Sequence, residues 1–156
     1  MQFTLPKEIG FDQFGNPDFV NGGLNYLDGE PTKWGFYQKA NPDLDVVNMS
    51  LYDAIREYKK RYFDIYETMD PPINLEHLSA PIAVALFDSG VNCGPYRAYK
   101  WYVEAIKDKE PVETLLALRR QHYTTLKTWP RFKNGWLNRL NDLRKYCEIL
   151  TVTSLE

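Results

Sequence analysis

The stretch from Leu78 to Pro95 constrains the fold of this chain more than any other. Ser79 is a favourable N-cap, Pro81 suits the first helical turn, and Gly94 followed by proline ends the segment. Between these ends, apolar residues fall on all sides of a helix: Ile82, Val84, Leu86, Phe87 and Val91. Such a helix is buried on most sides, and about a dozen residues are too few to cross a membrane. The sequence therefore predicts a buried central helix in a mainly helical domain.

Three polar residues fall near the C-terminal end of this helix, namely Asp88, Ser89 and Asn92. Polar groups in a buried helix need partners. We expect these partners either inside the fold or in a cleft that passes the helix end.

A chain of 156 residues is the size of one domain. We expect a single domain over residues 1–150, with a front lobe at 1–35, a helical part at 36–150 and a tail at 151–156. Glycine and proline turns fill the front lobe, and Tyr26 with Leu27 is expected to form one arm of a small hairpin. Caps such as Ser50 with Asp53, and apolar residues at helical spacing, predict further helices at residues 34–40, 50–66, 96–106, 111–127 and 132–150.

The formal net charge of −2 does not suggest a nucleic-acid partner. Residues 1–96 carry seven Lys/Arg and fourteen Asp/Glu, whereas residues 97–146 carry twelve and five. This division fits either a cleft that faces an anionic polymer or solvated helix faces whose opposite charges attract. Because residues 1–6 lack the charged-then-apolar order of a signal peptide, we expect neither a signal peptide nor a membrane anchor. We therefore expect synthesis in the cytoplasm, and delivery by another component if the target lies outside it.

The cysteines and histidines do not suggest a metal site. Cys93 and Cys147 are far apart, and His77 and His122 have no companion at ligand spacing. We expect free thiols, no metal and no cofactor. His122 falls on the predicted apolar stripe of its helix, which favours a core or interface histidine over a catalytic base. The other members of that stripe are Leu115, Leu118 and Leu126.

One group of polar residues in the front lobe has the chemistry for bond cleavage: Asp28, Glu30 and Thr32, followed by Trp34. Hydrolysis of a glycosidic bond needs a proton donor near the leaving oxygen and a second group that positions water or stabilises positive charge. Asp28 and Thr32 fit the positioning of water, and Trp34 fits packing against a sugar face. The same residues also fit a polar turn that enters a helix, so both interpretations stay open on composition alone.

Several segments form an ordered pattern along the chain. The first group comprises residues 32–36 (Thr-Lys-Trp-Gly-Phe), 39–42 (Lys-Ala-Asn-Pro) and 62–64 (Tyr-Phe-Asp). Residues 85–95 (Ala-Leu-Phe-Asp-Ser-Gly-Val-Asn-Cys-Gly-Pro) follow, and residues 129–132 (Trp-Pro-Arg-Phe) and 135–139 (Gly-Trp-Leu-Asn-Arg) end the pattern. From about residue 28 to residue 146, the chain resembles glycoside hydrolase family 108, the phage and prophage N-acetylmuramidases.

The resemblance implies a lysozyme-like fold that hydrolyses the β-1,4 bond after N-acetylmuramic acid in peptidoglycan, with a second half that binds peptidoglycan. In this family a helix ends in Glu-Gly-Gly-Tyr-Val-Asn, whose glutamate is the general acid. Aspartates and the threonine that matches Thr32 follow it. Asp28 and Thr32 are then catalytic candidates, while Asn21, Trp34 and Asn92 are candidates for binding substrate.

The chain departs from the family pattern at the general acid. By motif, Asn21 stands where the family has its glutamate, whereas ungapped spacing from Thr32 puts Asp18 there. Glu8, in Glu-Ile-Gly-Phe, and Glu30 are two further carboxylates that fit. An asparagine cannot donate the proton, which would remove roughly 10²–10⁴-fold of rate, and an aspartate is one methylene shorter than glutamate. Asp18, Glu30 and Glu8 therefore all stay open as the proton donor.

Two functions follow from these observations. The first is a peptidoglycan-cleaving muramidase that acts on a glycan strand of the cell wall, delivered by a holin-type partner or carried in a phage virion. The second is a catalytically silent relative that serves as a peptidoglycan-binding or structural module. A third interpretation has the front lobe contact a protein partner through Phe11, Phe14 and Phe19.

Overall fold

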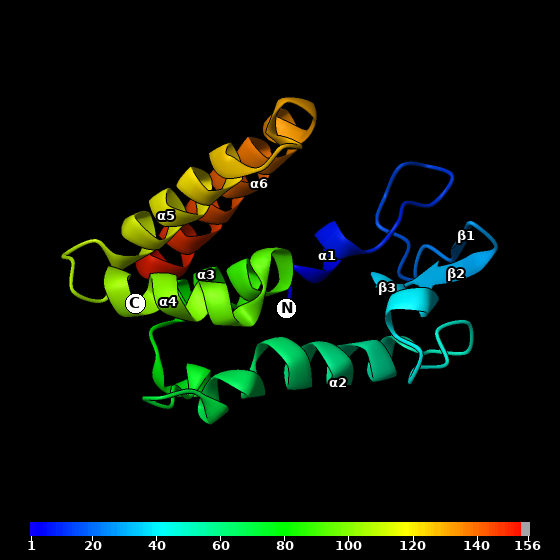
Figure 1. Cartoon of the computed structure of the whole chain (residues 1–156), viewed down its shortest axis with the longest axis horizontal. Helices are drawn as coiled ribbons and strands as arrows, with labels where there is room; N and C mark the ends of the chain where they lie inside the picture. The colour runs from blue at the N-terminus through cyan, green and yellow to red at the C-terminus, as the bar shows by residue number, and fades with distance from the viewer. Residues whose placement is uncertain (154–156) are drawn as a thin grey trace. The chain divides into compact units, whose positions relative to one another are not determined.

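The computed structural model describes residues 1–153, and Figure 1 shows the order of the elements. Over this range the chain is mainly helical, with 60% helix and a small three-stranded antiparallel sheet. The predicted combination of a helical fold with a small β-containing part is thereby confirmed. The chain separates into two compact units, unit 1 at residues 1–59 and unit 2 at residues 60–156. The division into one domain and a tail stays a prediction.

Unit 1 begins with the short helix α1 (Leu5–Glu8) and continues into the strands β1 (Asn25–Leu27), β2 (Glu30–Lys33) and β3 (Phe36–Tyr37). The strands are antiparallel in the order β1-β2-β3. The turn between β1 and β2 has Asp28 at φ 50° and Gly29 at φ 79°. Two consecutive left-handed residues match the right-handed twist of a hairpin, and this confirms the predicted arm at Tyr26 and Leu27.

The helix predicted at residues 34–40 is wrong. Trp34 and Gly35 are both left-handed, with φ of 55° and 82°, and such residues cannot belong to a right-handed helix. Phe36 and Tyr37 form strand β3 instead, and the helical part of this segment is limited to the 3-10 helix η1 (Gln38–Ala40).

Helix α2 (Leu51–Tyr62) begins in unit 1 and passes the boundary between the units. The predicted capping box is confirmed: the Asp53 N–H donates to Ser50 Oγ at 3.1 Å, and the Ser50 N–H donates to Asp53 Oδ2 at 3.0 Å. The helix ends before the predicted residue 66, because Asp64–Thr68 tighten into the 3-10 helix η2.

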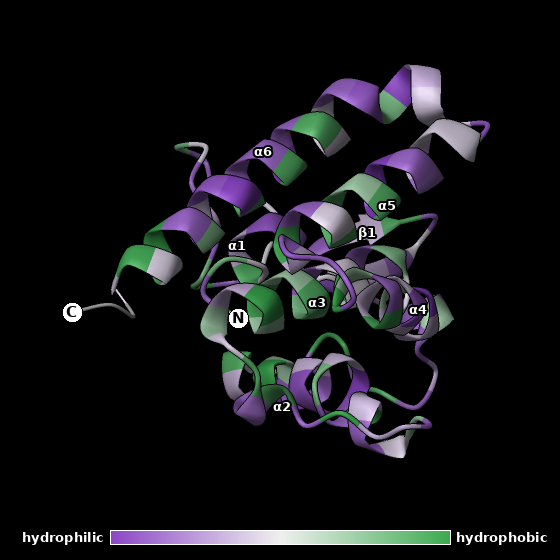
Figure 2. Ribbon diagram, turned by 90° about the vertical axis from the view of Figure 1, so that its left-hand side faces the viewer, coloured by the Kyte–Doolittle hydropathy of each residue, from purple (hydrophilic) through white to green (hydrophobic). Residues whose placement is uncertain are grey.

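Unit 2 is built on α3 (Ala80–Cys93), which contacts α4 (Pro95–Ala105), α5 (Pro111–Thr125) and α6 (Trp129–Thr153). The 3-10 helix η3 (Leu75–His77) precedes α3. Along α3 the buried residues run from Pro81 to Gly90 on several faces, which confirms the predicted buried central helix. Figure 2 shows the hydrophobic colouring of α3, and α5 and α6 lie side by side in Figures 1 and 2.

Two expectations for unit 2 need correction. Helix α6 starts at Trp129 rather than near residue 132, because Pro130 occupies its first turn, where a missing N–H costs nothing. The helix also continues to Thr153 and does not end at the predicted residue 150, and residues 154–156 lie outside the described residues. On α5 the fully buried residues are Leu115, Leu116, Arg119 and Tyr123, so Leu118, His122 and Leu126 lie at the edge of the buried face.

None of the helices within residues 1–153 combines the length and apolar character required to cross a membrane.

Candidate functional site

The hairpin of unit 1 presents a polar face. Its register pairs Thr32 with Asn25 on one side and with Tyr37 on the other, and it pairs Glu30 with Leu27. Paired residues project to the same side of a sheet, so Asn25, Leu27, Glu30, Thr32 and Tyr37 share one face. These five side chains are exposed or half-buried. On the opposite face Pro31 and Phe36 are buried, and they pair with Tyr26 and Lys33.

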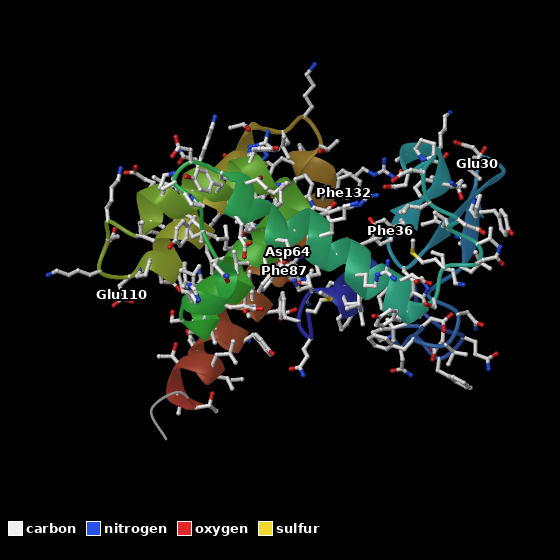
Figure 3. The ribbon with its side chains drawn as sticks, turned by 90° about the horizontal axis from the view of Figure 1, so that it is seen from below. Glu30, Phe36, Asp64, Phe87, Glu110 and Phe132 are labelled. Atoms are coloured by element: carbon white, nitrogen blue, oxygen red, sulfur yellow. The ribbon has the colours of Figure 1, made fainter. Side chains whose placement is uncertain are left out.

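Glu30 and Thr32 stand two residues apart on β2, which puts their Cα atoms roughly 6.6 Å apart. Asp28 occupies the turn at the end of the same hairpin and is exposed. Figure 3 labels Glu30 on β2 and Phe36 on β3. Three of the predicted catalytic residues therefore belong to one hairpin.

Glu8 meets the exit of this hairpin. It is the last residue of α1, and its Oε1 atom is buried. A Cβ added to Gly35 would lie 3.1 Å from Cβ of Glu8 and 3.2 Å from its carbonyl oxygen. Because Gly35 follows Thr32 by three residues, the end of α1 packs against the chain just beyond the polar strand.

Asp18 has a different environment. Its Oδ1 accepts the backbone N–H groups of Asn21 at 2.8 Å and Val20 at 3.1 Å. The hydrogen bond from the Asn21 backbone is the main reason that the pKa of Asp18 is lowered. A carboxylate stabilised in this way holds its turn together and is a poor proton donor at neutral pH. Asn21 itself has an exposed side chain.

Trp34 is 2% exposed, so its ring is not available to pack against a sugar as the sequence predicted. Its Nε1–H donates to the Met49 carbonyl at 2.9 Å, and its backbone N–H donates to the Gly22 carbonyl at 2.7 Å. Its own carbonyl accepts the Tyr58 hydroxyl at 3.0 Å. These bonds hold an aromatic residue at a positive φ that few bulky side chains adopt. Trp34 therefore supports the hairpin from inside unit 1.

Asn92 belongs to unit 2, in the last turn of α3. Its Oδ1 accepts hydrogen bonds from the Tyr123 hydroxyl and from Cys93 Sγ, the latter at 3.3 Å. The Tyr123 hydroxyl in turn accepts from Arg119 Nε at 2.8 Å. Asn92 is thus engaged in a side-chain network within the helical unit.

The centre of that network is Asp88, which is 0% exposed. Arg119 donates to Asp88 Oδ2 at 2.8 Å, and Arg139 donates to both carboxylate oxygens, at 3.1 Å and 2.8 Å. Arg119 also donates to Ser89 at 3.1 Å. Sequence reasoning gave partners to Asp88 only in general terms and missed Arg119, although its spacing of four residues from both Leu115 and Tyr123 puts it on a buried face.

His122 lies between aromatic rings, with centroids 5.6 Å from Trp101 and 6.5 Å from Tyr123. Burial, together with the positive charge of Arg97, lowers its pKa and favours the neutral imidazole. This environment agrees with the core or interface position predicted for it. Within residues 1–153, no group of three His, Cys, Asp or Glu side chains is arranged to hold a metal ion.

No protein-family model, curated protein or solved structure matches this chain. Its function therefore has to follow from the chemistry of residues such as Glu8, Glu30 and Thr32.

Proposed function

We propose that this protein is a muramidase with a lysozyme-like architecture, which hydrolyses the β-1,4 bond after N-acetylmuramic acid in peptidoglycan. The order of the chain supports the proposal: a short helix ending in an acid, a small antiparallel sheet, a connecting helix and a helical unit. The resemblance of residues 28–146 to glycoside hydrolase family 108 points to the same reaction. The observation that carries the proposal is the contact of Glu8, at the end of α1, with Gly35 beyond the strand that bears Thr32.

In the proposed mechanism, Glu8 is the general acid. Its carboxyl proton passes to the glycosidic oxygen as the bond to the anomeric carbon breaks, and positive charge develops on the sugar ring. The carboxylate of Glu30, on the same sheet face as Thr32, stabilises that charge. Asp28 and the Thr32 hydroxyl position a water molecule, and Asp28 accepts its proton as the water adds to the anomeric carbon. Asn21, whose side chain is exposed in the same unit, remains a candidate for binding the glycan.

The test is release of muropeptides from purified sacculi between pH 4 and pH 8, with the reducing ends identified as muramic acid. Glu8→Gln should lower the rate roughly 10²–10⁴-fold, because a carboxamide is far too weak an acid to transfer a proton to the glycosidic oxygen. Asp18→Asn is the matched control: an amide oxygen at residue 18 still accepts the N–H groups of Val20 and Asn21, so the rate should change little. Loss of activity in Asp18→Asn with full activity in Glu8→Gln would move the acid to Asp18.

A second candidate function is a catalytically silent module that binds peptidoglycan or contributes to a phage particle. It is favoured by the environment of Asp18, whose lowered pKa opposes proton donation, and by the amide of Asn21 at the motif position of the family acid. This function predicts that the folded protein sediments with sacculi and releases no muropeptides at any pH in the range. In either function a phage virion or a holin-type partner brings the protein to the wall.

A further inference from the structure

In unit 1, residues 11–27 carry several large apolar side chains that are exposed. Phe14 is 78% exposed and Phe11 is 70% exposed. The further exposed members between residues 11 and 27 are Phe19, Val20, Leu24, Tyr26 and Leu27. Single exposed apolar residues are common, but a cluster in one short segment typically marks an interaction surface.

The loop that displays Phe11 and Phe14 is tightly hydrogen-bonded. Oδ1 of Asp12 accepts the N–H groups of Phe14 at 2.8 Å and Asn16 at 2.9 Å. The Asp12 N–H donates to the Asn16 carbonyl at 2.7 Å, and Phe11 forms a bridge with Pro17. The aromatic rings are therefore presented by a backbone that is already ordered, which lowers the entropy lost on binding.

A depression of about 610 Å³ accompanies this loop, and its lining includes Phe11, Phe14 and Phe19. The carboxylate-bearing residues Asp12 and Asp18 also line it. The depression therefore combines aromatic walls with acidic groups.

The charge of the segment has one sign. From residue 11 to residue 27 the chain contains two acidic residues, Asp12 and Asp18, and neither Lys nor Arg. An acidic, apolar surface is complementary to a ligand that is apolar and basic, and it is repelled by the anionic headgroups of a bilayer.

We infer that residues 11–27 form a docking surface for a basic, apolar segment of a partner protein, with Phe11 and Phe14 as its anchors. This surface is a function beyond glycan hydrolysis and does not depend on it. Aromatic anchors surrounded by polar groups are the residues that dominate binding energy in protein interfaces.

The test uses the full chain and a fluorescently labelled amphipathic peptide of Leu and Lys, with a peptide of Leu and Glu as its charge control. The Leu and Lys peptide should bind, and added salt should lower its affinity, because screening reduces the attraction between exposed charges. The double variant Phe11→Ser/Phe14→Ser should lose roughly tenfold or more in affinity, since losing an interface anchor costs more than about 1 kcal/mol. Tyr96→Ser removes an equally exposed aromatic of unit 2 and should leave the affinity unchanged.

Several results would overturn the inference. Equal affinity for the two peptides, or an unchanged affinity in the double variant, would remove the docking surface. If the wild type bound anionic lipid vesicles and the double variant did not, the surface would be reassigned to a membrane. If the wild type self-associated and the double variant did not, the surface would be reassigned to a second copy of the chain. Loss of muropeptide release in the double variant, with peptide binding intact, would assign the loop to the glycan. A wild-type protein that binds the peptide and releases no muropeptides would defeat the proposed hydrolysis alone.

Discussion

Gly35, just after strand β2, lies close to Glu8 at the end of α1 and to Tyr58 on α2. Its φ of 82° is left-handed, and an added Cβ would collide with the Tyr58 hydroxyl and press on Glu8 at 3.1 Å. Gly29 has a similar φ of 79° and nothing within 4 Å of an added Cβ. The two glycines therefore separate the cost of the backbone conformation from the cost of space.

Gly35→Ala should lower the free energy of unfolding by about 2–5 kcal/mol, because a left-handed alanine is strained and the added methyl group overpacks the site. Gly29→Ala should cost only the strain, about 1–2 kcal/mol. Urea unfolding followed by circular dichroism measures both. Equal losses in the two variants would show that the contacts of Gly35 do not constrain it.

Asp88 is a second residue that we expect to contribute strongly to the stability of the protein. Asp88→Asn should destabilise the protein by about 3–5 kcal/mol, because it leaves the buried guanidinium of Arg119 without its carboxylate. Glu113→Gln is the control, since it removes an ion pair with Arg144 whose side chains are 48% and 38% exposed. That change should cost less than about 1 kcal/mol. A similar loss in both variants would contradict the importance given to burial.

The same carboxylate makes stability depend on pH. Burial raises the pKa of Asp88, but the positive charges of Arg119 and Arg139 outweigh this effect, so the pKa lies below the ordinary value of 3.8. The stabilisation is therefore complete above pH 3.8 and is lost as the pH falls through the lower folded-state value. Thermal unfolding from pH 7 to pH 2 should show the advantage of the wild type over Asp88→Asn shrinking at the acidic end. An advantage that stays constant would exclude this linkage.

Among the helices, α2 and α3 each begin at a serine, Ser50 and Ser79, and the two side chains differ in their hydrogen bonds. Ser50 Oγ accepts the Asp53 N–H at the start of α2, whereas the Ser79 side chain makes no capping hydrogen bond at the start of α3. Ser50→Ala should therefore cost about 1 kcal/mol, and Ser79→Ala should be nearly neutral. Chemical denaturation of the two variants measures the difference, and a reversed order would refute the assignment.

Much of the element order could be predicted from caps, proline and periodicity. Ser79 with Pro81 located the start of α3, and the Asp28-Gly29 turn located the hairpin, because these signals act within a few residues. Trp34 could not be placed in this way, since its positive φ depends on Met49 and Tyr58, which are distant in sequence.

The candidate site was predictable to a similar extent. Asp28, Glu30 and Thr32 are neighbours in sequence, so a hairpin was enough to group them. The burial of Trp34 and the contact between Glu8 and Gly35 arise from tertiary packing and carry no local signal. Arg119 is an intermediate case, because helical spacing indicated its face while its charge argued for solvent.

For the chain as a whole, the division into two compact units falls within helix α2, which begins in unit 1 and ends in unit 2. We expect a local loss of stability to stay within the unit that carries it. In Asp88→Asn, hydrogen exchange should accelerate at the amides of α3 and α5, while the Trp34 amide, bonded to Gly22, keeps its protection. Mass spectrometry of peptic fragments resolves these segments, and uniform acceleration along the chain would mean that the units unfold together.

The carboxylate of Asp88 serves guanidinium groups from two successive helices, α5 and α6. Neither helix can therefore be exchanged independently in a chimera with another protein. A graft that replaced α5 without supplying an arginine would leave the carboxylate of Asp88 paired with Arg139 alone. A graft that replaced α3 without supplying the aspartate would remove the carboxylate that both Arg119 and Arg139 bind. The three helices should be transplanted, or redesigned, as a set.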